Sequence, residues 1–334
     1  MGSLRKLFVL LLVVAGCGGD GAITTTTDDT STTTTAAAPS ITTSTTAATT
    51  TTESDTGFPV TIETGGAVVT IGSRPERVVS LSPTATEMLF AIGAGEQVVA
   101  VDSFSYYPPE APVTDLSGFE PNVEAVVGFE PDLVVLSSDP GDVVAGLEAA
   151  GVPALVFPAA VTLDDTYTQI EQLGAATGRI GDAAALVGQM RADIDELAAS
   201  VPERDEPLTY YHELDDTLFS VTSRTFIGEI YALAGLQSIA DAADPDGEAG
   251  GYPQLSAELL VSADPDLIFL ADTKCCGQNA DTLAQRPGFD QLTAVAEGRV
   301  IELDDDIASR WGPRIVEFFR KIVEATAAIE VPAG

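Results

Sequence analysis

The sequence has 334 residues, of which 45% are hydrophobic, enough to build two domains of ordinary size behind an unstructured segment. It contains 51 acidic residues against 15 basic ones, a formal net charge of −36, and its basic residues form no stripe. This balance excludes nucleic acid as a partner and argues against docking to an anionic membrane surface.

Residues 1–16 have the pattern of an export signal. Arg5 and Lys6 form a basic start, and residues 7–14 are an apolar run too short to span a bilayer. The run leads into Val-Ala-Gly-Cys at residues 14–17, which resembles the lipobox of bacterial lipoproteins. The resemblance implies cleavage before Cys17, lipidation of its thiol and an extracytoplasmic location on the outer face of the cell membrane. An ordinary signal peptide followed by a chance cysteine is the alternative.

Residues 17–57 are dominated by threonine, with alanine and serine. They contain almost no large apolar side chain, so burial cannot offset the entropy lost on ordering, and we expect a disordered linker. A flexible chain of about 40 residues has an end-to-end distance of roughly 35 Å, so it would tether a globular domain without fixing its orientation. Composition permits O-glycosylation of this linker and does not establish it.

Residues 58–180 alternate between short apolar strands and helices, which predicts an α/β lobe with a parallel sheet covered by helices. The first of these helices has N-cap candidates in Ser82 and Thr84 and stop signals in Gly93 and Gly95. The expected strands are residues 77–81, 97–101, 132–138 and 153–157, and the expected helices are residues 82–95, 122–129 and 141–151.

Residues 181–201 carry one apolar stripe at helical spacing. Apolar side chains recur three and four positions apart with no internal proline, which predicts a single bridging helix of about 31 Å. Such a helix between two α/β lobes would make a relatively stiff pair; an ordinary crossover helix inside one lobe is the alternative. The stripe comprises Ala183, Val187, Met190, Ile194, Leu197 and Val201.

Residues 202–334 repeat the organisation of the first lobe. NVEAVVGFEPDLVVL (residues 122–136) and SAELLVSADPDLIFL (residues 256–270) both carry a glutamate, six further residues and Pro-Asp-Leu, in the same register. The duplicated pattern predicts two related α/β lobes. In the second lobe we expect strands at residues 208–214, 218–221, 266–272 and 299–303 and helices at residues 225–235, 256–263 and 312–329.

No constellation typical of an enzyme is present. His212 is the only histidine and lies in a strand-like segment, where a structural role is usual, so multi-histidine metal sites are excluded. There is no glycine-rich phosphate loop, nucleophile elbow or CxxC motif. A hydrolase would need Ser82 paired with His212, which is the remaining enzymatic alternative. We therefore expect neither catalysis nor a resident cofactor or metal.

Large side chains gather where the predicted strands end, which is the edge at which open α/β folds bind ligands. Aromatic rings there would form flat walls suited to a large, partly apolar ligand such as a macrocycle or a metal chelate. Packing in the core or between the lobes is the alternative. The residues concerned are Phe104, Tyr106, Tyr107, Phe119, Phe219, Tyr252, Arg310 and Trp311.

Cys275 and Cys276 are adjacent and follow the second Pro-Asp-Leu strand. Consecutive Cα atoms are about 3.8 Å apart, below the usual disulfide range of about 4.4–6.8 Å, so a vicinal disulfide would be strained. Disulfides persist in exported proteins, and the sequence leaves a disulfide and two free thiols equally open. In either state we expect the pair to lie beside the ligand.

Six segments together resemble the iron-siderophore and cobalamin substrate-binding proteins of bacterial ABC importers. They are RVVSLSPTATEMLFAIGAG, VVAVDSFSYYPPEAP, PNVEAVVGFEPDLVVL, TFIGEIYALAG, YPQLSAELLVSADPDLIFL and RWGPRIVEF, within about residues 68–325. SLSPTATE and YYPPEA are most similar to the cobalamin branch. The resemblance implies two Rossmann-like α/β lobes joined by a single long rigid helix, with a ligand cleft between the lobes and no catalysis.

Carried over by motif, the resemblance implies that the transported ligand is a corrinoid, with cobalamin as the first choice. Asp306 and Arg310, in DIASRWGPRI, would supply polar contacts to it. The side chains facing the corrinoid would be Phe104, Phe119, Phe219 and Tyr252, with Tyr107 and Trp311 beside them.

The sequence departs from the cobalamin pattern in several places. Phe119 and Tyr252 stand where tryptophans line that pocket, Ser137 occupies another such place, and the stretch around Phe119 is one residue short. A heme-binding protein would use an axial tyrosine, for which Tyr106 and Tyr107 are available. A ferric siderophore would favour basic side chains, and the candidates are Arg224, Arg310 and Arg314.

In this family one surface glutamate per lobe pairs with arginines of the membrane permease, and Glu124 and Glu258 match those positions. A carboxylate–guanidinium contact would fix the docking register, and charges at a rim raise encounter rates. The alternative is that both glutamates only stabilise a helix N-terminus. The expected partners are an ABC permease dimer with its ATPase subunits and a small metal-chelate ligand, and we expect a monomer held at the membrane by its lipid alone.

Overall fold

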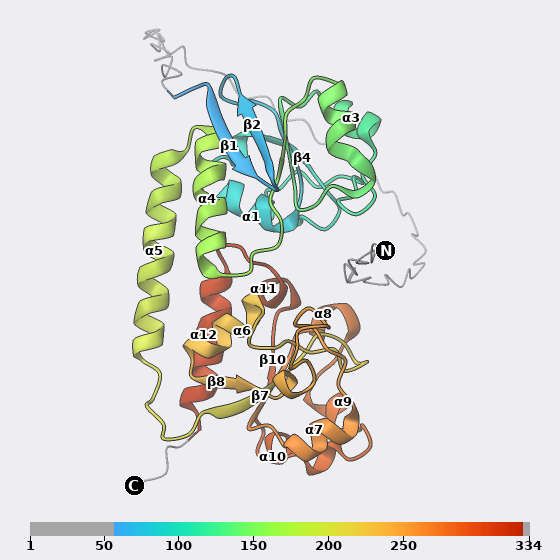
Figure 1. Ribbon diagram of the computed structural model, residues 1–334, viewed down its shortest axis with the longest axis vertical. Coiled ribbons are helices and arrows are strands. Elements are labelled where there is room, and N and C mark those ends of the chain that lie inside the picture. The colour runs from blue at the N-terminus through green and yellow to red at the C-terminus, as the bar shows by residue number, and fades with distance from the viewer. Residues whose placement is uncertain (1–56, 330–334) are drawn as a thin grey trace, which may run out of the picture. The chain divides into compact units, whose positions relative to one another are not determined.

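The computed structural model describes residues 57–329, so the predicted export signal, the lipidation site Cys17 and nearly all of the threonine-rich linker lie outside the described residues. The described residues form two α/β lobes (Figure 1). Each lobe is built on a four-stranded parallel sheet, which confirms the predicted α/β class. No helix in this part of the chain is both long enough and apolar enough to cross a bilayer.

The first lobe follows the predicted alternation of strands and helices. Its strands are β3 (Val78–Leu81), β4 (Val98–Val101), β5 (Leu133–Leu136) and β6 (Ala154–Val156), its helices are α1 (Pro83–Ala91), α2 (Val123–Val127) and α3 (Val143–Ala149), and 3-10 turns lie at Gly95–Gln97 and Pro140–Asp142. The sheet order is β4-β3-β5-β6, and the two central strands are buried at every position because helices cover both faces. Ser82 caps α1, since its hydroxyl accepts the Ala85 amide at 3.3 Å.

The second lobe repeats this topology. Its strands are β7 (Leu208–Glu213), β8 (Leu236–Ser238), β9 (Leu267–Leu270) and β10 (Val300–Glu302), its helices are α6 (Phe226–Leu233), α7 (Ala257–Ala263), α8 (Thr273–Cys276), α9 (Ala280–Ala284), α10 (Thr293–Ala296), α11 (Asp305–Ser309) and α12 (Ile315–Ala327), and 3-10 turns lie at Ile239–Ala242 and Phe289–Gln291. Written from its other edge, the sheet order β8-β7-β9-β10 matches the order β4-β3-β5-β6 of the first lobe strand for strand. The two copies of the repeated segment become α2-β5 and α7-β9, which are equivalent places in the two sheets.

The chain passes from the first lobe to the second through one long helix, α5 (Ile180–Ala199), as predicted. α4 (Leu163–Thr177) and α5 form a hairpin, and α5 packs along both α4 and α12 (Figure 1). The side chains of the predicted stripe from Ala183 to Ile194 are buried, and the largest hydrophobic cluster runs through these helices into both lobes. α4 was not among the predicted elements; Thr162 begins it, in a capping box with Asp165.

Other segments also differ from the sequence prediction, among them β8 and the short helices α8, α9, α10 and α11, which were not expected. A hairpin of β1 (Val60–Thr64) and β2 (Ala67–Ile71) precedes the first sheet, and it turns through Gly65 and Gly66, whose φ angles are +59° and +78°. The strand expected at residues 218–221 reduces to one bridge between Phe219 and Gln254, because Leu218 adopts φ +72° and breaks the extended backbone.

Candidate functional site

The candidate site lies where the loop after β4 in the first lobe meets the segment after β10 in the second. The hydroxyl of Tyr106 is 2.9 and 2.7 Å from the two carboxylate oxygens of Asp306, across 200 positions of sequence. Arg310 donates from Nη2 to the main-chain carbonyl of Phe104 at 3.3 Å. The structure therefore brings Phe104, Asp306 and Arg310, which were predicted to share a site, into one junction.

A buried carboxylate shapes the loop of the first lobe. Asp102 follows β4; its Oδ1 accepts the Phe104 amide at 2.8 Å and its Oδ2 accepts the Ser105 hydroxyl at 2.9 Å. Burial raises the pKa of Asp102, while these donors oppose the rise. The two hydrogen bonds fold the loop back on the strand end, so the aromatic side chains that follow are turned outward.

Four aromatic side chains form an exposed patch on the first lobe. Phe104 is 40% exposed and Phe119 is 52% exposed, and their rings meet edge to face with centroids 5.7 Å apart. A Cβ at Gly118 would lie 2.5 Å from the Leu81 carbonyl oxygen, so only glycine lets this loop approach the end of β3 and bring Phe119 to Phe104. Exposed apolar patches of this kind mark binding sites. The patch consists of Phe104, Tyr106, Tyr107 and Phe119.

The predicted aromatic residues of the second lobe are more enclosed. Phe219, Tyr252 and Trp311 are half-buried and pack against the large core cluster. The indole N–H of Trp311 donates to Oε1 of Gln169 on α4 at 2.9 Å. Among the described residues no ring contact or side-chain hydrogen bond joins these three to the exposed patch, so packing accounts for part of their burial. Ser137, just after β5, is half-buried as well.

Glu87 of α1 ties the two lobes together and was missed as a functional residue. Its carboxylate is 2.7 Å from Arg310 Nη1, and Arg314 approaches it with Nε at 2.8 Å and Nη2 at 2.5 Å. Glu87 is only 3% exposed, and a buried carboxylate requires such partners. The available signal was a glutamate inside the otherwise uncharged helix PTATEMLFA.

The cations at the junction are all paired with carboxylates. Asp306 accepts from Arg310 Nη2 at 2.6 Å and from Lys274 Nζ at 3.3 Å, and Lys274 also lies 2.6 Å from Asp304. The guanidinium of Arg314 lies 4.0 Å from the centre of the Tyr107 ring. Three cations, Lys274, Arg310 and Arg314, thus face three carboxylates, Glu87, Asp304 and Asp306.

The third basic candidate for a siderophore lies in another place. Arg224 pairs with the buried Asp244 at 3.4 Å and donates to the Pro245 carbonyl at 3.3 Å. These contacts hold the loop between β8 and α7. All three predicted basic candidates are therefore engaged by acidic side chains of the protein itself.

The adjacent cysteines are joined by a disulfide in α8, next to the junction. Asp305 of α11 accepts the backbone amides of Thr273 at 2.8 Å and Cys275 at 2.7 Å. Both cysteines are exposed. Because Asp305 precedes Asp306, this clamp connects the cysteine pair directly to the candidate site.

The two predicted docking glutamates occupy equivalent positions. Glu124 lies in the first turn of α2 and Glu258 in the first turn of α7, behind the N-caps Asn122 and Ser256. Both side chains are exposed, and neither forms an ion pair among the described residues. They are free to meet a partner, one from each lobe.

His212 and Ser82 have separate structural roles. His212 is fully buried with Nδ1 2.8 Å from the Tyr231 hydroxyl, and burial lowers its pKa to about 3. The hydroxyl of Ser82 caps α1. No hydrogen bond joins the two within residues 57–329, so the pairing that a hydrolase would require is not formed there.

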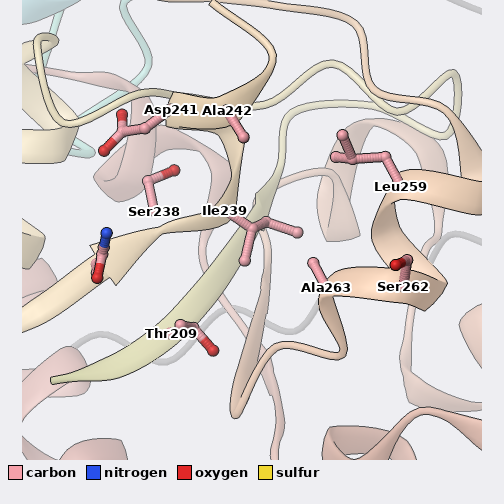
Figure 2. Close-up of a pocket in the computed structure, with 9 residues that line it drawn as sticks. Thr209, Ser238, Ile239, Asp241, Ala242, Leu259, Ser262 and Ala263 are labelled. Atoms are coloured by element: carbon pink, nitrogen blue, oxygen red, sulfur yellow. The ribbon is translucent and has the colours of Figure 1, made fainter. Parts of the chain in front are cut away.

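A cavity of about 410 Å³ lies in the second lobe, apart from the predicted ligand residues. Figure 2 shows Leu259, Ser262 and Ala263 of α7 on one side of it and Ser238 and Asp241 on the other. Its remaining lining residues are Thr209, Gln237, Ile239 and Ala242. None of these lining residues is aromatic, so the cavity lacks the flat aromatic walls that suit a macrocycle.

Comparison with known proteins assigns the family. The sequence profile described as periplasmic binding protein matches residues 78–307. The chain is 35% identical over 284 residues to a cobalamin-binding protein of Halobacterium salinarum (80% of this chain, 74% of the relative) and 30% identical over 278 residues to the uncharacterized ABC transporter substrate-binding lipoprotein YvrC of Bacillus subtilis (80% and 85%). The periplasmic heme-binding protein RhuT of Roseiflexus sp. RS-1 matches with a TM-score of 0.66 and 28% identity (76% and 98%). The chain therefore belongs to the periplasmic binding protein family, whose members are substrate-binding proteins of transporters and not enzymes.

Proposed function

We propose that this protein captures a corrinoid, with cobalamin as the first choice, and delivers it to an ABC permease. The observation that carries the proposal is the exposed aromatic patch beside cations that are already paired with carboxylates of the protein. A corrinoid is a large, partly apolar macrocycle with neutral amide side chains, so it can use flat walls without needing an opposite charge. The cobalamin-binding relative from Halobacterium salinarum supports the same ligand.

An anionic ferric chelate fits this site less well. It would meet the carboxylates of Asp304 and Asp306, while Arg310 and Arg314 are held by Glu87. Drawing either arginine away would leave the buried Glu87 with one cationic partner in place of two, which is costly. A neutral hydroxamate siderophore would avoid this cost and stays the alternative within the same class.

Heme is the second alternative, favoured by the similarity to RhuT. A tyrosinate ligand to the iron would come from Tyr106 or Tyr107. Burial and the hydrogen bond to Asp306 raise the pKa of Tyr106, which disfavours its tyrosinate form. The heme propionates would also require cations, and those of the junction are paired with carboxylates.

We further propose that the mature chain is a lipoprotein organised as Cys17 with its linker to residue 57, a first lobe at residues 58–180, a bridging helix at residues 181–201 and a second lobe at residues 202–334. The name of the YvrC relative supports lipidation. Glu124 and Glu258 would dock to arginines of the permease, and their exposure and equivalent places support this role.

Calorimetric titration tests the ligand. The purified protein is titrated with cyanocobalamin, with hemin and with a ferric hydroxamate siderophore, each at fixed salt and pH. We expect saturable heat from cyanocobalamin and a dissociation constant below that of the other two. Tight binding of hemin or the siderophore, without heat from any corrinoid, would overturn the proposed ligand while leaving the transport class in place.

A further inference from the structure

We infer that Tyr106 is a specificity-determining latch that the ligand must displace from Asp306. The inference rests on the proposed function, because it takes the ligand to bind at the junction of the two loops. Its consequence is chemical: a ligand that reaches Asp306 has to bring a hydrogen-bond donor of its own, such as an amide N–H.

Three donors crowd the carboxylate of Asp306. A carboxylate offers about four acceptor positions on its two oxygens. Oδ1 is 2.6 Å from Arg310 Nη2 and 2.9 Å from the Tyr106 hydroxyl, and Oδ2 is 2.7 Å from that hydroxyl and 3.3 Å from Lys274 Nζ. The single hydroxyl proton of Tyr106 is shared between the two oxygens, and the side chain of Asp306 is only 14% exposed while Tyr106 stays in place, so a ligand has little access to the carboxylate.

Among these three partners, Tyr106 is the one that can leave. Arg310 is one helical turn from Asp306 and is also held by Glu87, and Lys274 is also held by Asp304. Tyr106 comes from the opposite lobe, is 49% exposed and has no other side-chain hydrogen bond among the described residues. Rotation of an exposed side chain takes picoseconds to nanoseconds, so opening the latch requires no movement of the lobes.

The buried link between the lobes remains when the latch opens. Glu87 is 3% exposed and is held by Arg310 and Arg314 together, and the helix α5 joins the lobes separately. The two links thus have different characters, since the Glu87 contacts are enclosed and doubly paired whereas the Tyr106 contact is open to solvent. The first suits permanent attachment of the lobes and the second suits exchange.

The latch selects against ligands by chemistry. A ligand donor that replaces the phenol hydroxyl restores the hydrogen bond lost on opening. A carboxylate or another acceptor-only group would leave Asp306 facing a like charge or an unsatisfied contact, which costs affinity. The junction would therefore admit amide-bearing macrocycles in preference to polycarboxylates.

The test compares cyanocobalamin binding by the wild-type protein with that by Tyr106→Phe, which keeps the ring and removes the hydroxyl. We expect the dissociation constant to fall by about threefold to tenfold, the value of one exposed hydrogen bond to a charged group. Tyr167→Phe is the matched control, because Tyr167 lies on α4 under Arg191 and its hydroxyl has no hydrogen bond among the described residues. It should change the constant by less than twofold.

The Asp306→Asn background separates a latch from a general effect of the hydroxyl. If Tyr106 acts through the carboxylate, Tyr106→Phe should produce little or none of its gain in that background. Weaker or unchanged binding by Tyr106→Phe, or a gain that persists in Asp306→Asn, would overturn the latch while leaving the proposed function intact. If the wild type binds no cyanocobalamin, binding by Tyr106→Phe would uphold the latch, and no binding by either protein would overturn the latch and the proposed ligand together.

Discussion

A buried acid pair in the second lobe should make the stability of this protein fall as the pH rises. Asp272, just after β9, is fully buried and neither of its carboxylate oxygens has a hydrogen-bond partner. Glu213, at the end of β7, is also fully buried, but it is held by Arg286 at 2.6 Å through both oxygens and by the Tyr211 hydroxyl at 3.1 Å. The single guanidinium is used by Glu213, so Asp272 is the carboxyl that carries a proton.

The direction of this pH dependence follows from whether the folded or the unfolded protein holds the proton. Burial, and then the charge of Glu213, raise the pKa of Asp272 from 3.8 to about 8. Between these two values the folded protein holds a proton that the unfolded chain has released, so the free energy of unfolding decreases as the pH rises through this window and levels off above it. The loss is at most about 1.4 kcal/mol per pH unit, a few kcal/mol in all.

Asp272→Asn is the informative change, because the amide keeps the shape of the protonated acid and cannot ionise. Urea unfolding at several pH values between 5 and 9, followed by circular dichroism, measures the free energy of unfolding of each protein. We expect the variant to lose the downward slope and to exceed the wild type by a few kcal/mol above pH 8. Asp205→Asn, at an exposed loop position, should follow the wild type. Identical pH profiles for the wild type and Asp272→Asn would refute the protonated state.

Three further predictions concern the interlobe link, the docking charges and the cysteine pair. Glu87→Gln leaves Arg314 without a countercharge and Arg310 with Asp306 alone, and it should lower the free energy of unfolding by about 3 kcal/mol in urea titrations, whereas a change below about 1 kcal/mol would contradict its role. Glu124→Ala combined with Glu258→Ala should abolish stimulation of the permease ATPase in proteoliposomes while calorimetric ligand affinity stays unchanged; full stimulation would count against docking through these residues. Cys275 and Cys276 should resist alkylation, as measured by mass spectrometry, until a thiol reductant is added, and free alkylation of both would exclude the disulfide.

The lobes could be predicted because their determinants are local. Four-residue runs such as Leu133–Leu136 and Leu267–Leu270 are apolar at every position, and each follows Pro-Asp in the same register, so both the buried strands and the duplication are visible in the sequence. The signals for two missed elements were also local. Gly65-Gly66 marks the β1–β2 hairpin, and Thr162 with Asp165 marks the start of α4.

Sequence position predicts which segments border the site, but not the contacts that form between them. Position after a strand predicted that Phe104 and Arg310 follow the carboxyl ends of their sheets, because this follows from chain order in a parallel fold, whereas Asp306 was named only from the family resemblance. The partners themselves depend on how one lobe faces the other. Tyr106 meets Asp306 across 200 positions and Glu87 meets Arg310 across 223, and no periodicity encodes such pairs.

These pairs change what the two arginines indicate about the ligand. In isolation, Arg310 and Arg314 in an otherwise acidic chain indicate capture of an anion. In the fold their side chains are only 11% and 12% exposed, and both form ion pairs with Glu87. Their charge therefore stabilises the attachment of one lobe to the other. Affinity for a ligand must then come mainly from desolvated aromatic surface, with Asp306 as an acceptor once Tyr106 has moved. A site of this composition favours a neutral macrocycle over a charged chelate, since only the former gains from the walls without disturbing the charges that join the lobes.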